Sequence, residues 1–243
     1  MTHYLGIITA YGAVAILAWL LALLYPRLIP AAGEYAVDAR WRKAGLFLLA
    51  LAVAIGLSRL RAQGWLLADG NVWLSAVNQL LVIVPFLVFI LYMRSRAAAL
   101  IPDRHILRSL AVGAMLAIPA LLAFYSSVDG WQTIPALLDA LTLGDTAAIA
   151  LRSLLRCLVV GAFLALVAGG WSGRTALALA AIAIAATQIP SLLDGGFSAE
   201  WLVVLIAHVA LVVGLLSAIL VTRNIVWFWP VLVALNLLQF HTF

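Results

Sequence analysis

Charged residues, acids above all, are scarce in this sequence. Only 9% of the 243 residues are charged, and nine acids stand against fourteen bases. A water-soluble domain of this length needs a polar surface around its core, and so few charged side chains cannot supply one. The composition therefore excludes a soluble enzyme or a soluble binding domain.

Cysteine and targeting features are also lacking. Cys157 is the single cysteine, which excludes an intrachain disulfide. The N-terminus has no basic stretch and no small-residue cleavage site, so residues 4–25 are predicted to be a retained first span rather than a signal peptide. The bases are distributed among particular loops, which argues against nucleic acid as a partner.

Long apolar runs are what the chain does have, and 67% of its residues are hydrophobic. The runs are continuous rather than alternating, which indicates membrane-spanning helices and not a barrel. We expect an all-α, polytopic membrane protein in which residues 1–243 form one integral membrane domain. Eight spans are predicted, at residues 4–25, 44–60, 72–93, 106–125, 146–171, 175–193, 201–221 and 225–240.

The bases predict an orientation for these spans. Most of them fall in alternate loops: Arg27, Arg40, Arg42, Lys43, Arg94, Arg96, Arg104, Arg108, Arg174 and Arg223. The loops after the fourth and sixth spans have none. Because basic loops remain in the cytoplasm, both termini are expected on the non-cytoplasmic side of a bacterial inner membrane.

Two arginines interrupt the span at 146–171. Arg152 and Arg156 lie four residues apart and therefore share one helix face. A charge at this depth costs about 2.5–3.5 kcal/mol on insertion scales, so a partner is expected. The candidates within the chain are backbone carbonyls or Asp139, Asp145 and Asp194. Candidates outside it are a lipid phosphate or an acidic residue of another protein.

Three segments carry a family resemblance. Leu151–Phe163, LRSLLRCLVVGAF, resembles the segment EELLFRGLLLGAL of the CAAX protease and bacteriocin-processing family, with Arg156 at the motif arginine. Ile184–Leu192 resembles the family's FxxxHxP stretch, and Thr222–Trp227 resembles its connector between the last two helices. The resemblance covers roughly the last hundred residues and implies an eight-helix intramembrane protease fold.

The residues that catalyse peptide hydrolysis in that family are absent. Other residues occupy the positions of its glutamates, its histidines and its final Asn or Asp: Leu151, Arg152, Gln188, Ala234 and Leu238. Asn236 is nearby but at a different spacing. Hydrolysis by this route needs a carboxylate base and a held water, which these side chains cannot provide. We therefore expect a pseudoenzyme without a cofactor, acting as a binding or scaffolding subunit of a membrane complex.

A rhomboid-like serine protease is an alternative interpretation. The sequence GWSG at 170–173 fits the GxSG pattern of rhomboids, and the segment beginning at Ala207 resembles their histidine helix. Ser172 would then be the nucleophile and His208 its base. Only one predicted span separates the two, however, and Ser172 lies in a predicted turn, where serine is common.

The remaining polar residues of the spans have structural and functional interpretations. Asn78, Gln79 and His208 are typical of hydrogen bonding between helices, and Gln188 can satisfy the carbonyl freed by Pro190. No residue has metal-ligand spacing with His208, so no metal site is expected. Binding of a lipid or isoprenoid phosphate by Arg152 and Arg156 is a third functional hypothesis.

Overall fold

The computed structural model describes residues 2–33, 40–65, 72–127, 143–170, 172–187 and 199–240. Within these residues the chain is all-helical, with eight α-helices, one short 3-10 helix and no strand. The elements are α1 (Thr2–Leu24), α2 (Arg40–Ala62), α3 (Val72–Tyr92), η1 (Arg96–Ala99), α4 (Ile106–Ser127), α6 (Leu143–Gly170), α7 (Gly173–Thr187), α9 (Ala199–Thr222) and α10 (Phe228–Phe240).

Five helices are long and apolar enough to cross a membrane. Their spanning stretches are Gly6–Leu24, Trp41–Arg61, Ile106–Ser127, Thr146–Gly170 and Leu205–Thr222. The other three helices contain shorter apolar stretches, at Ala76–Tyr92, Gly173–Ile182 and Phe228–Leu237. The all-α class of a membrane-embedded chain is thus confirmed, and five of the eight predicted spans meet the length criterion.

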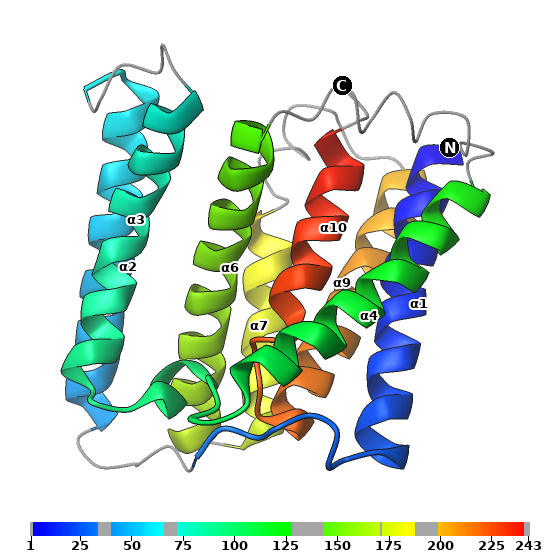
Figure 1. The fold of residues 1–243 in the computed structure, drawn as a ribbon, viewed down its shortest axis with the longest axis horizontal. Coiled ribbons are helices and arrows are strands. Elements are labelled where there is room, and N and C mark those ends of the chain that lie inside the picture. Colours follow the sequence, from blue (N-terminus) through cyan, green and yellow to red (C-terminus); the bar gives the residue numbers. More distant parts are fainter. Residues whose placement is uncertain are drawn as a thin grey trace.

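The helices alternate in direction, so both chain ends lie at one end of the bundle. Figure 1 shows α1 beginning and α10 ending at the same end. The connections after α1, α3, α6 and α9 all lie at the opposite end, which we call the connector end. This arrangement places alternate loops on opposite faces, as the distribution of bases predicts.

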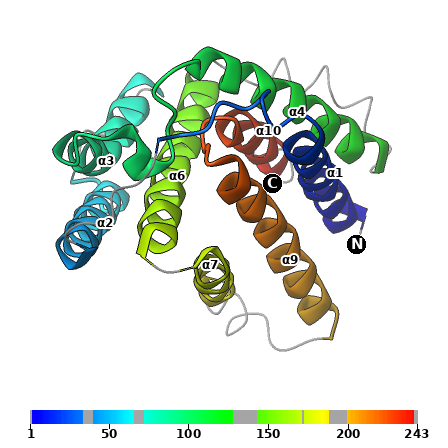
Figure 2. The same cartoon turned by 90° about the horizontal axis from the view of Figure 1, so that it is seen from below.

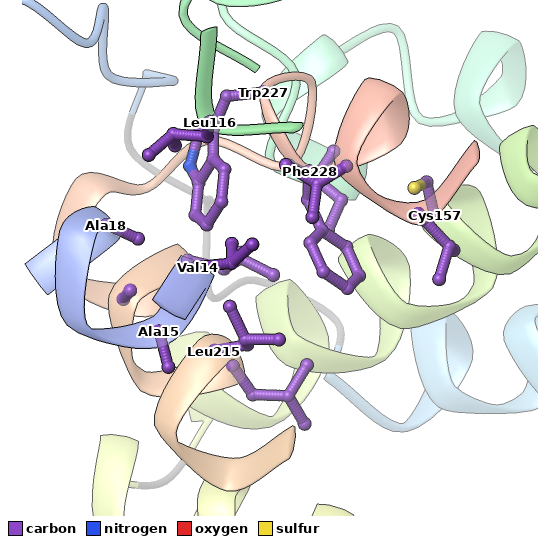
Figure 3. Close-up of a cluster of buried hydrophobic side chains, with 14 of the residues drawn as sticks. Val14, Ala15, Ala18, Leu116, Cys157, Leu215, Trp227 and Phe228 are labelled. Atoms are coloured by element: carbon purple, nitrogen blue, oxygen red, sulfur yellow. The ribbon is translucent and has the colours of Figure 1, made fainter. Parts of the chain in front are cut away.

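The apolar core has two parts that share α6. The larger part packs α1, α4, α9 and α10 around Trp227, Leu215 and Val14, as Figure 3 shows. The smaller part lies among α2, α3 and α6 and contains Phe86, which is fully buried. The α2–α3 pair stands to one side of the bundle next to α6 (Figures 1 and 2). Helix α6 therefore joins the two halves of the protein.

The connector between α9 and α10 ties four segments together at the connector end. The side chain of the fully buried Asn224 donates to the carbonyl of Pro30 (2.6 Å) and to Ser109 Oγ (2.8 Å), and its Oδ1 accepts from the Val226 N–H (2.8 Å). The Ile225 N–H bonds to the carbonyl of Leu100 at 2.9 Å. Because this buried amide uses both its N–H groups and its oxygen in hydrogen bonds, it fixes the position of the connector between α9 and α10.

Two glycines allow this close packing. A Cβ at Gly113 of α4 would overlap the carbonyl of Trp227, and a Cβ at Gly161 of α6 would overlap that of Ala99. Small residues of this kind let helix and loop backbones approach in membrane proteins. The connector end is therefore closely packed, with α4 against the α9–α10 connector and α6 against η1.

Candidate functional site

Helix α6 places its two arginines inside the membrane. Arg156 is ten residues beyond the start of the spanning stretch Thr146–Gly170, about 15 Å along the axis at 1.5 Å per residue. The hydrocarbon core is about 30 Å thick, so Arg156 lies near its middle. Arg152, one turn earlier, is about 9 Å from the same end. Both side chains are exposed at the surface of the chain.

Arg156 contacts α10 through a chain of hydrogen bonds. Its Nη1 donates to Asn236 Oδ1 at 2.9 Å, and Asn236 Nδ2 donates to Ser153 Oγ at 2.7 Å. Ser153 Oγ in turn donates to the carbonyl of Ile149 at 2.8 Å. Each member is polar, and only Arg156 is charged. The contact therefore positions the guanidinium, and no described residue provides a counterion for its charge.

Arg152 makes fewer contacts than Arg156. It makes no hydrogen bond or ion pair with any residue that the structure describes. The charges of Arg156 and of Arg61, at the end of α2, act on Arg152. Arg152 and Arg156 thus place two like charges on one face of α6. Like charges repel most strongly where the dielectric constant is low, so this region favours an anion.

A pair of aromatic rings lies within electrostatic reach of Arg156. Tyr11 of α1 is buried, and its ring meets the His208 ring of α9 edge to face, with the centroids 5.6 Å apart. The charge of Arg156 acts on the Tyr11 hydroxyl. Helices α1, α6 and α10 therefore contribute polar groups to the region around Arg156, and the ring contact joins Tyr11 to His208 of α9.

Ser172 and His208 are not brought together. Ser172 Oγ accepts from the Thr175 N–H at 3.2 Å and so caps the N-terminus of α7. Gly173 lines the same hollow as Leu220, at the connector end of α9. His208 is twelve residues before Leu220, which is about 18 Å along the helix. A serine and a base must lie within hydrogen-bonding distance, and this geometry does not provide that.

The other predicted site residues have separate locations. Asn78 and Gln79 are buried in α3. Gln188, Asp139 and Asp194 lie outside the described residues, and so do any contacts they make with the arginines. Cys157 is buried in the core near Phe228, which excludes reagents from its thiol (Figure 3).

No general base is found at the positions that match the protease motif. Leu151 packs into the smaller core, and Ala234 is buried in α10. In the part of the chain that the structure describes, no three His, Cys, Asp or Glu residues gather closely enough to hold a metal ion. The chemistry available at the site is therefore donation of hydrogen bonds and positive charge.

Two surface hollows lie away from the arginines. One, of about 340 Å³, is lined by ends of α6, α7 and α9, including Gly169 and Arg223. The other, also about 340 Å³, lies between the loops at Pro30–Gly33 and at Asp103–His105. Both are at the connector end, so neither contributes to the arginine site.

Sequence reasoning missed two residues of this site. Asn236 stood out as a polar residue in an apolar span, but its spacing did not match the family motif. Tyr11 gave no signal, because an aromatic residue in an apolar helix is ordinary core. Comparison of the chain with protein-family models, with curated proteins and with solved structures found no match.

Proposed function

We propose that this chain is a non-catalytic membrane protein with a CAAX-protease-like bundle, which serves as a binding or scaffolding subunit of a membrane complex. One observation carries the proposal. Arg156, near the middle of a span, bonds to the neutral amide of Asn236 at 2.9 Å and to no carboxylate among the residues that the structure describes. A guanidinium at that depth costs several kcal/mol unless an anion compensates it. Binding of an anionic group supplies that compensation.

The arrangement supports binding over hydrolysis. The positions that hold glutamates in the protease family are Leu151 and Arg152 here, and neither abstracts a proton at neutral pH. Ser172 is used as a helix cap, about 18 Å along the bundle from His208. A positive charge without a nearby base holds an anion and does not activate a nucleophile.

The proposal includes a location and an orientation. We place the protein in a bacterial inner membrane, with the connector end in the cytoplasm and both termini on the other side. The support is the concentration of bases at that end, among them the exposed Arg27, Arg94 and Arg104. Basic residues next to spans remain on the cytoplasmic side.

A lipid phosphate binder is the second candidate, and the depth of Arg152 favours it. At about 9 Å from the end of the span, its guanidinium can extend toward the headgroups along the membrane normal. A phosphate diester would accept a bidentate contact there. Arg156 is too deep for the same contact, which is why we rank a protein partner first.

Native mass spectrometry from lipid nanodiscs tests the proposal. The wild-type chain should be released with a protein partner, and Arg152→Gln/Arg156→Gln should lose it while retaining helical circular dichroism. Arg59→Gln, which removes an exposed arginine at the end of α2, is the matched control and should retain the partner. Release of wild-type monomer alone would contradict the proposal, and arginine-dependent lipid adducts would select the second candidate.

A further inference from the structure

The exposed face of α6 restricts what can cover its arginines. Arg156 lies about 15 Å from the nearer end of the span, whereas an extended arginine side chain reaches roughly 7 Å from its Cα. Headgroup phosphates lie outside the hydrocarbon core. The guanidinium of Arg156 is therefore beyond their reach, and its counterion has to be located within the apolar layer.

A second copy of this chain cannot supply that counterion from its spans. The nine acids are Glu34, Asp38, Asp69, Asp103, Asp129, Asp139, Asp145, Asp194 and Glu200. None of the nine lies within a spanning stretch of the residues that the structure describes. No carboxylate within the spanning stretches of the described residues is therefore available to Arg156, which points to one from a different protein.

The neighbouring helices define the limits of the available face. Phe163, on the same side of α6 two turns beyond Arg156, contacts Phe47 of α2 with ring centroids 6.4 Å apart. That contact covers the face toward the connector end. On the other side, Asn236 of α10 lies against Arg156. The part that the described residues leave uncovered is the stretch that carries Arg152 and Arg156, between α2 and α10, and Figure 1 shows α6 standing between these helices.

We propose that a transmembrane helix of another membrane protein, with one Asp or Glu near the middle of its span, docks on this face of α6. Its carboxylate accepts hydrogen bonds from Arg156 and Arg152. The guanidinium fork suits a carboxylate, and Asn236 holds Arg156 in place for it. This inference rests on the proposed function and names the chemistry of the partner.

The test uses the full chain and a defined probe. Two labelled peptides are made as leucine–alanine helices of about 20 residues, one with a central Asp and one with Asn at that position. Energy transfer to the reconstituted protein is measured in phosphatidylcholine vesicles. The Asp peptide should bind at least about tenfold more tightly than the Asn peptide. Equal affinity for the two peptides would overturn the inference, and this comparison requires no variant.

Variants then locate the contact. Arg152→Gln/Arg156→Gln should abolish the preference for Asp, and Arg59→Gln should preserve it. If phosphatidylglycerol at equal surface density abolishes the preference, the anion bound is a lipid and the inference fails. The proposed function is judged separately. If a native partner remains bound to the wild-type chain but the Asp peptide is not preferred, the proposed function is retained. Only the inference that the partner offers a carboxylate is then rejected.

Discussion

The guanidinium of Arg156 and the amide of Asn236 are joined at 2.9 Å, although 80 residues separate them in the chain. The same amide donates to Ser153 at 2.7 Å, so Asn236 uses both of its ends to link α10 to α6. An amide satisfies a donor without neutralising its charge. The pair therefore combines a fixed geometry with a positive charge that no described residue neutralises, the two properties that a binding site for an anion needs.

Replacement of that amide by a carboxylate should block the site. In Asn236→Asp the new side chain pairs with Arg156 inside the chain, so the affinity for the Asp-containing peptide should fall about tenfold or more. The peptide assay above measures the change, with the Asn-containing peptide as control. Unchanged affinity would mean that Arg156 does not contact the partner.

Loss of the amide should destabilise the α6–α10 contact. Asn236→Leu removes the hydrogen bonds of Asn236 to the buried Ser153 and to the exposed Arg156, and one such hydrogen bond contributes about 0.5–1.5 kcal/mol. We expect a lower midpoint of unfolding in detergent, followed by circular dichroism. A variant as stable as wild type would show that this chain of hydrogen bonds contributes no stability.

The close approach at Gly113 should be intolerant of a methyl group. In Gly113→Ala the added Cβ overlaps the carbonyl of Trp227, so we expect a loss of about 1–3 kcal/mol, typical of overpacking. Gly56→Ala is the matched control, because a Cβ at Gly56 of α2 meets no atom within 4 Å. The two variants are compared by thermal unfolding in the same detergent. An equal loss of stability in both would be inconsistent with the packing described.

Ser172 should matter for stability and not for binding. Ser172→Ala removes the cap of α7 and should cost about 0.5–2 kcal/mol, whereas Ser172→Asp keeps an acceptor at the cap position. The double variant Ser172→Asp/His208→Phe retains the ring contact with Tyr11 and should bind the Asp peptide as wild type does. Weaker binding by this variant would place one of the two residues at the site.

Cysteine labelling tests the orientation. Cys157 should resist maleimide in the folded protein because it is buried. In a Cys157→Ala background, Arg27→Cys and Gln63→Cys place thiols at exposed positions on opposite ends of the bundle. A membrane-impermeant reagent added to intact cells should label position 63 and not position 27. The reverse pattern would invert the proposed topology.

Much of the fold followed from local sequence, because a span is a local property. An apolar run of about 20 residues has to be helical in a bilayer, since no water is present to satisfy its backbone groups. This argument predicted α1, α4, α6 and α9 with ends within a few residues of those observed. The segment at 188–193, predicted as the end of a span, lies outside the described residues.

The site was less accessible from sequence. The spacing of Arg152 and Arg156 placed both on one face of a helix, and the structure shows them so. The sequence could not show that Asn236 contacts Arg156, because that contact depends on how α10 packs on α6. Packing of one apolar helix on another is set by the shapes of side chains distant in sequence and not by hydrophobicity.

The sequence by itself determined that the chain is an all-helical membrane protein with two charges inside one span, because the bilayer admits only helices there and charge is read directly from residue type. The tertiary structure decided which neutral group holds Arg156, which side of α6 stays uncovered, and that Ser172 and His208 are about 18 Å apart along the bundle. Distances between helices arise from close packing and hydrogen bonds across the bundle, and neither is encoded in any single segment.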